Sequence, residues 1–181
     1  MKNLFHRCLL FAFIAVFVAG FTSCRKREEI RVEGMAPIYV DPLDKSLIYR
    51  EDPREFENLG IIVKVGKYLF INERLKGIHV LDNSDPKNPV RKHFWRIPGN
   101  TRFTIDGDVL YADNSVHLLT IDISDYSRIR VVHINEDIYE PDEIFRPELG
   151  YRGPFECVDL TKGAFVGWEK RELVNPKCEA L

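Results

Sequence analysis

Short apolar or alternating segments, separated by clusters of Gly, Asn, Asp and Pro, recur through residues 61–140. Segments of this length and spacing are typical of antiparallel strands joined by tight turns. The pattern predicts eight strands here, over residues 61–65, 67–72, 77–82, 90–97, 102–106, 108–113, 116–122 and 128–134. Four more strands are predicted in the flanks, over residues 37–41, 46–50, 155–160 and 163–170. The last two form a predicted hairpin over 155–170 that turns at Thr161-Lys162-Gly163.

The central segment is an internal repeat of two units, residues 61–100 and 102–140. Gly66 of the first unit matches Gly107 of the second, and each is expected to supply the positive φ of a tight turn. The other matches are Leu69 with Leu110, Phe70 with Tyr111, Asn72 with Asp113, Asp82 with Asp122, Ser84 with Ser124 and Asp85 with Asp125. The last pair is expected to bond its own backbone two residues further on, which would fix the second turn of each unit.

A unit of about 40 residues with four strands has the size of one β-propeller blade. The predicted fold class is therefore all-β: two four-stranded, blade-like antiparallel meanders, an incomplete propeller, with flanking strands and loops. A closed ring needs at least about four blades. The flanks are either degenerate blade pieces, or the chain is an open two-blade sheet with exposed edges that pair or are covered. We expect coverage by the flanks, with homodimerisation through an exposed edge as the alternative.

The segment Ile78–Pro89 (IHVLDNSDPKNP) resembles the LVIVD repeat, in which an apolar strand ends in Asp and is followed by Ser-Asp-Pro and a second Pro. Leu119–Asp125 (LTIDISD) is similar, with Tyr126 and Ile129 in place of the prolines. Residues 35–40, 66–73 and 163–168 also resemble segments of Gram-negative bacterial lipoproteins that carry this repeat. The resemblance implies a propeller-type repeat and says little about activity, since many members of the family have no assigned function.

The amino-terminal segment, residues 1–23, is predicted to be an export signal. Its uncharged run from Cys8 to Phe21 is too short for a membrane-spanning helix, which needs about 20 residues. Thr22-Ser23-Cys24 then resembles a bacterial lipobox, which implies cleavage before Cys24 and acylation of that cysteine. The alternative is an ordinary secretory signal. Residues 24–36 would be a lipidated tether and 37–181 a single domain, held in the Gram-negative cell envelope, with the outer membrane expected.

The remaining cysteines, Cys157 and Cys178, are an even pair in an exported chain and are predicted to form a disulfide. Closing a loop of about 20 residues would contribute roughly 3 kcal/mol in the chain-entropy model. The alternative is two unpaired thiols.

Composition and charge narrow the function classes. The chain has 181 residues, with 45% hydrophobic and 30% charged, which excludes disorder as a description of the whole. The net charge of −2 and the lack of a basic stripe beyond residues 25–27 argue against nucleic-acid binding. The sequence contains no nucleophile elbow, phosphate loop or dinucleotide fingerprint. We therefore predict no enzyme, no cofactor and no metal site.

The titratable side chains give no stronger lead. The four histidines of the predicted domain are interpreted as strand-surface or half-buried residues rather than metal ligands: His79, His93, His117 and His133. The acidic run over residues 135–143 is interpreted as a solvated loop rather than a calcium site.

The aromatic residues bear most directly on function. Trp95 and Trp168 are candidate binding aromatics, because an exposed aromatic patch would mark a partner surface or a sugar platform. The alternative is that both lie in the core. The sequence thus supports a non-catalytic interaction scaffold on the membrane first, a cell-surface protein binding a glycan or nutrient second, and an enzyme with scattered carboxylates last. Burial of both tryptophans would disfavour the glycan platform.

Overall fold

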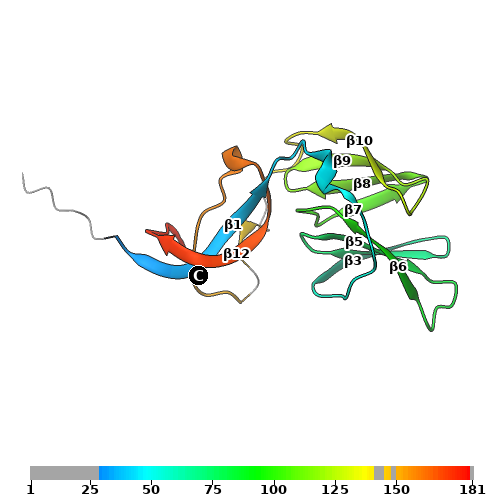
Figure 1. Cartoon of the computed structure of the whole chain (residues 1–181), viewed down its shortest axis with the longest axis horizontal. Helices are drawn as coiled ribbons and strands as arrows, with labels where there is room; N and C mark the ends of the chain where they lie inside the picture. The colour runs from blue at the N-terminus through cyan, green and yellow to red at the C-terminus, as the bar shows by residue number, and fades with distance from the viewer. Residues whose placement is uncertain (1–28, 141–144, 148–149, 180–181) are drawn as a thin grey trace, which may run out of the picture. The chain divides into compact units, whose positions relative to one another are not determined.

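The computed structural model describes residues 29–140, 145–147 and 150–179. The predicted signal and Cys24 lie outside the described residues. The chain divides into two units, and the fold described below is that of the second unit, Arg31–Leu181. This unit is all-β as predicted, with three sheets that stay open (Figure 1).

The first repeat forms a five-stranded antiparallel sheet in the order β2-β6-β5-β4-β3. Its strands are β2 (Tyr49–Glu51), β3 (Leu59–Val65), β4 (Tyr68–Glu73), β5 (Gly77–Asp82) and β6 (Val90–Arg96). Four of them are the predicted meander of the repeat. The fifth, β2, comes from the amino-terminal flank and pairs with β6.

The second repeat forms a four-stranded antiparallel sheet in the order β10-β9-β8-β7. Its strands are β7 (Phe103–Asp106), β8 (Val109–Asn114), β9 (His117–Asp122) and β10 (Arg130–Asn135). The repeat extends to the register: Val80 faces His93 in the first sheet and Thr120 faces His133 in the second, each next to a bulge. The predicted antiparallel strands of each repeat are therefore present, and none of the sheets formed by the described residues is closed or curled.

The turns of the two repeats form as their sequence predicts. Gly66 and Gly107 have φ of 56° and 57°, a conformation that costs glycine little. The Asp85 carboxylate accepts the Lys87 N–H at 3.0 Å, and the Asp125 carboxylate accepts the Ser127 N–H at 2.9 Å. These side chain–backbone bonds hold the second turn of each unit.

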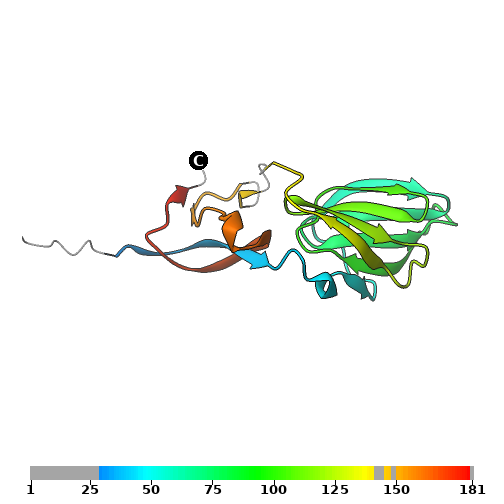
Figure 2. The same ribbon diagram turned by 90° about the horizontal axis from the view of Figure 1, so that it is seen from above.

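The two repeat sheets pack face to face around one hydrophobic core (Figure 2). The first sheet contributes residues such as Phe70, Val80 and Trp95, and the second contributes residues such as Leu110 and Leu119. Trp95 has no exposed surface, so it is a core residue and not a surface platform. Burial of large apolar side chains on two facing sheets is what fixes the pair.

The outer face of the first repeat sheet is covered by the flanking loop over residues 52–58. The Phe56 ring meets the His79 ring edge-on at 4.8 Å, and the Arg54 guanidinium lies 4.9 Å from the Phe94 ring. His79 and Phe94 are consequently buried although they point away from the shared core. The expected coverage concerned the sheet edges, and it occurs at one edge, where β2 of this flank pairs with β6, while β3 at the other edge pairs only with β4 among the described strands.

The remaining strands form a third sheet in the order β12-β1-β11-β13. They are β1 (Arg31–Val40), β11 (Pro154–Phe155), β12 (Ala164–Val174) and β13 (Cys178–Glu179). The hairpin predicted over 155–170 is wrong, because β12 pairs antiparallel with β1 along ten residue pairs and residues 160–162 form a 3-10 helix. β11 pairs instead with β1, in parallel, and with β13.

The predicted tether also differs, since residues 31–36 belong to β1. Their charges had indicated a solvated segment, but they alternate along the strand and pair across it. Arg31 contacts Glu172 at 2.9 Å and Lys170 contacts Glu33 at 3.0 Å. Beyond them along the strand, Ala36 is fully buried. A charged period-2 pattern is thus the exposed face of a strand here.

Cys157 and Cys178 form a disulfide, with a Cα–Cα distance of 5.5 Å. Because Cys178 belongs to β13, the bond ties this last strand to the chain that follows β11. The predicted pairing is confirmed.

Candidate functional site

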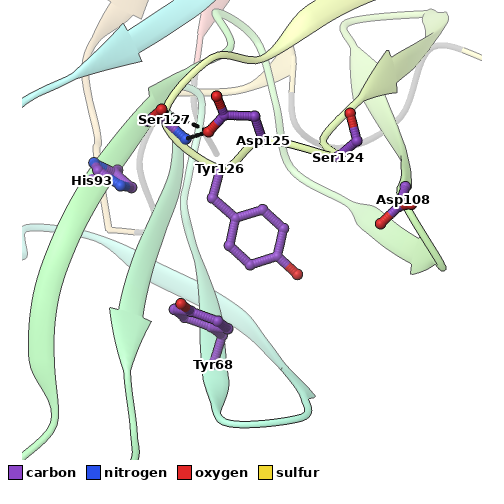
Figure 3. A pocket seen from close by; sticks show the side chains of 7 residues that line it. All are labelled: Tyr68, His93, Asp108, Ser124, Asp125, Tyr126 and Ser127. Carbon is purple, nitrogen blue, oxygen red and sulfur yellow. Dashed lines mark hydrogen bonds between the residues drawn. The ribbon is translucent and has the colours of Figure 1, made fainter.

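A hollow of about 500 Å³ opens between the two repeat sheets, beside the turn that joins β9 to β10 (Figure 3). The hollow is shallow and largely open to solvent rather than enclosed. Its lining consists of Tyr68, His93, Asp108, Ser124, Asp125, Tyr126 and Ser127. We call this set the inter-repeat groove.

Tyr126 forms the groove because it occupies the turn position where the first repeat has Pro86. Its ring extends between the sheets and meets the Tyr68 ring edge-on at 4.9 Å and the Phe70 ring at 5.4 Å. Its carbonyl accepts the Trp95 indole N–H at 3.0 Å. The departure from the repeat pattern thus places a rigidly packed aromatic side chain at the opening between the sheets (Figure 3).

Strand β6 supplies His93, whose imidazole has a defined tautomer. Its Nδ1 accepts a hydrogen bond from Arg50 Nε at 3.1 Å. Burial lowers the pKa of His93, and the charges of Arg50 and Lys92 lower it further. The neutral ring therefore carries its proton on Nε2, which is left as a hydrogen-bond donor.

The β9–β10 turn supplies carboxylate and hydroxyl groups. The Ser127 hydroxyl and N–H both donate to Asp125 Oδ1, at 2.6 and 2.9 Å. These bonds lower the pKa of Asp125, which keeps it ionised at neutral pH. Because the Ser127 proton is donated to a carboxylate, this arrangement is that of an Asx turn rather than of a serine activated by a base.

The tyrosine of the same turn stays neutral. Burial raises the pKa of Tyr126, and Tyr68 and the Asp108 carboxylate raise it further. The groove therefore presents two carboxylates among neutral donors and acceptors, and its lining includes no Lys or Arg.

A second titratable cluster is buried under the loop over residues 52–58. The Glu73 carboxylate accepts the N–H of Glu57 at 3.1 Å, the N–H of Asn58, and a bond from His79 Nε2 at 3.0 Å. Burial raises the pKa of Glu73, but the Glu57 N–H, the His79 ring and the Asn58 N–H outweigh it, so the pKa is lowered. The cluster fastens the loop to the sheet.

His79 remains neutral in this cluster. Burial lowers its pKa more than the Glu73 carboxylate raises it. The ring lies between the rings of Phe56 and Phe94, both at 4.8 Å, and its buried Nδ1 has no hydrogen-bond partner among the described residues. Protonating Nδ1 would leave a buried donor unsatisfied, which explains the direction of the shift.

A buried polar network joins the two repeats. Asn72 Nδ2 donates to Asn100 Oδ1 at 2.7 Å, and Asn100 Nδ2 donates to Asp113 Oδ1 at 2.8 Å. Asp113 also accepts the Thr101 N–H at 2.7 Å. The match of Asn72 with Asp113 in the repeat was the sequence signal for this junction, and Asn100 connects the two.

The two tryptophans predicted as binding aromatics belong to different clusters. Trp95 lies in the core beneath the groove, as described above. Trp168 is half-buried in the third sheet, packs edge-on against Phe155 and Phe165, and donates to the Arg146 carbonyl at 3.1 Å. The structure therefore does not bring them together as one platform, and Trp95 is ruled out as an exposed aromatic.

The histidines and the acidic run are also placed. His117 is buried and its Nδ1 accepts the Asp137 N–H at 3.2 Å, whereas His133 is exposed. His79 and His117 are therefore buried, contrary to the predicted surface or half-buried setting. Residues 141–143 of the acidic run lie outside the described residues.

The sequence did not single out His93 and Tyr126 as site residues. Two features of the sequence could have indicated them. His93 occupies the same repeat position as His133, and Tyr126 occupies the position at which the first repeat has Pro86.

No family model, curated protein or solved structure matches the chain. In the described part of the chain no three His, Cys, Asp or Glu side chains gather as a metal site. Nor does any described helix have the length and apolar character needed to cross a membrane.

Proposed function

We propose that the protein is a lipid-anchored, extracytoplasmic interaction module of the Gram-negative cell envelope, related to the LVIVD-repeat lipoproteins and without catalytic activity. The observation that carries the proposal is the disulfide between Cys157 and Cys178. Such bonds persist in oxidising compartments and are rare in the cytosol. Together with the lipobox-like Thr22-Ser23-Cys24, the disulfide supports export followed by acylation of Cys24.

The proposed partner surface is the open edge of the first repeat sheet. Strand β3 pairs only with β4 among the described strands, and Leu59, Ile61 and Ile62 on it are exposed, Ile62 to 61%. A sheet edge with apolar side chains is a template for pairing with another strand. The edge supports a protein partner or a second copy of the chain as its occupant.

A second candidate function is the binding of a glycan or nutrient at the cell surface. The observation that favours it is the inter-repeat groove, where Tyr68 and Tyr126 stand among hydroxyl, carboxylate and imidazole groups. For this candidate function the proposed binding aromatics are therefore Tyr68 and Tyr126 rather than Trp95 and Trp168.

The test of the anchor is the intact mass of the protein recovered from membranes, compared between the natural chain and a Cys24→Ala variant. We expect three acyl chains on the natural chain and an unmodified, membrane-released protein for the variant. A Cys8→Ala variant is the control and should be acylated like the natural chain, because Cys8 lies in the predicted signal. An unmodified natural chain in the soluble fraction would contradict the proposal.

Separation of inner and outer membranes then tests the location. Recovery of the acylated protein with outer-membrane markers is expected, and recovery with inner-membrane markers alone would contradict that part of the proposal.

A further inference from the structure

We infer that the inter-repeat groove is a binding site for a neutral, polyhydroxylated ligand, a saccharide, in which the aromatic surface of Tyr126 and Tyr68 is flanked by fixed hydrogen-bond donors and acceptors. This inference rests on the second candidate function and gives it a site and a ligand chemistry. It is carried by the polar groups that line the groove, by the packed tyrosine rings beside them and by the charges around them.

The polar groups of the groove match a ligand that both donates and accepts hydrogen bonds. His93 Nε2 is a donor, because Arg50 occupies Nδ1 of the same ring. The carboxylates of Asp108 and Asp125 are acceptors, and the Ser124 hydroxyl can do either. Sugar hydroxyl groups need this mixture, whereas a purely apolar ligand would leave these groups unpaired.

The groove also offers an aromatic surface that does not have to be ordered on binding. The Tyr126 ring is held by edge-on contacts with Tyr68, Phe70 and Trp95 at 4.9, 5.4 and 5.7 Å. Figure 3 shows this ring with His93 on one side and Asp108 on the other. A rigid ring between polar groups lets the apolar face of a sugar stack while its hydroxyl groups are bonded.

The charges in the groove disfavour an anionic ligand, and the cation Lys67 already contacts one of its two tyrosine rings. An anion would face two carboxylates with no Lys or Arg in the lining. A cation would compete with Lys67, whose ammonium already lies 5.2 Å from the Tyr68 ring centroid and 3.7 Å from the Asp82 carboxylate. Arg50, which bonds His93, is paired with Asp52 at 3.1 Å. A neutral ligand meets neither obstacle.

The test is saturation-transfer NMR on the full-length protein in detergent. Maltotriose, cellotriose and N,N′-diacetylchitobiose are the saccharide probes, choline is the cationic probe and inorganic phosphate the anionic one. We expect transfer to at least one saccharide at millimolar concentration, and none to choline or phosphate.

The groove is tested with the double variant Asp108→Asn/Asp125→Asn, which removes both charges and keeps an oxygen acceptor for the Ser127 turn. Its matched control is Asp85→Asn/Asp106→Asn, which removes two charges at the equivalent turn and at the end of β7. We expect about tenfold weaker saccharide binding in the groove variant, because two charged acceptors become neutral ones and their hydrogen bonds weaken, and unchanged binding in the control.

Three results would overturn the inference: no transfer to any of the three saccharides, equal binding by the groove variant and its control, or groove-dependent binding of choline or phosphate instead. The last result would leave the second candidate function standing with another ligand class. Acylation of Cys24 is read by mass independently, so failure at the groove and failure of the anchored-module proposal are distinguishable.

Discussion

The two repeats form antiparallel sheets with the same order of strands along the chain, but the outer faces of these sheets differ. The first repeat sheet is covered on its outer face by the loop over residues 52–58, under which Glu73 and His79 are buried. The outer face of the second sheet has no such loop and carries exposed polar residues such as Thr104 and His133. The outer faces of the two repeat sheets therefore differ: a packed loop covers the first, and exposed polar residues lie on the second.

The turn between β5 and β6 also differs from the equivalent turn between β9 and β10. Pro86 lies exposed in the turn between β5 and β6, whereas Tyr126 at the equivalent position of the second repeat enters the space between the sheets. Ile129, which replaces the second proline, is also buried in the shared core. The two residues that replace the prolines therefore have different effects: Ile129 adds to the shared core, and Tyr126 lines the groove.

The largest expected effect concerns the packing between the repeats. Trp95→Ala should lower the free energy of unfolding by about 3–5 kcal/mol, because the indole is fully buried between the two sheets. Denaturant titration measures the change. Trp168→Ala is the comparison, and since Trp168 is half-buried its loss should be clearly smaller. Equal losses for the two variants would contradict the shared core as the main source of stability.

The next effect concerns the cover of the first repeat. Glu73→Ala leaves the N–H groups of Glu57 and Asn58 and the His79 ring without their acceptor, which should cost about 2–3 kcal/mol. The matched control is Glu33→Ala, whose exposed ion pair with Lys170 should contribute at most about 1 kcal/mol. Hydrogen exchange should also show opening of residues 52–58 in the first variant only. An unchanged loop in Glu73→Ala would break the comparison between the two faces.

The smallest effect is the pH dependence that the same cover imposes. The lowered pKa of His79 means that the unfolded chain takes up its proton first, so stability is lost as pH falls below about 6.5. The lowered pKa of Glu73 adds a further loss below about 4.5. A His79→Phe variant, followed by thermal unfolding between pH 7.5 and 5, should lose less stability than the natural chain. His93 has a lowered pKa too and keeps part of the dependence. Identical pH profiles would contradict a buried neutral His79.

Much of the fold could be predicted because the same pattern of strands and turns occurs in both repeats of the sequence. The matched glycines and aspartates fix the turns of both repeats, and the strands between them are within a few residues of their predicted bounds. The third sheet could not be predicted in the same way. Its pairing of β1 with β12 joins the two ends of the domain, and no local pattern signals a contact at that sequence separation.

The candidate site was less accessible to sequence reasoning. Trp95 and Phe94 are neighbours on β6 and point to opposite faces of the sheet. Both are buried, because the second repeat covers one face and residues 52–58 cover the other. The role of Tyr126 depends on a turn whose direction into the core is a tertiary property, and the tautomer of His93 depends on Arg50 from a distant strand.

The most direct test of the whole account is peptide mapping by mass spectrometry of the native protein, alkylated without reduction. The account predicts a cross-linked peptide pair through Cys157 and Cys178, together with an acylated amino-terminal Cys24. This result would place the folded domain outside the cytoplasm and on a membrane. Alkylated thiols at Cys157 and Cys178 and an unmodified Cys24 would contradict both the third sheet's covalent tie and the proposed anchored function.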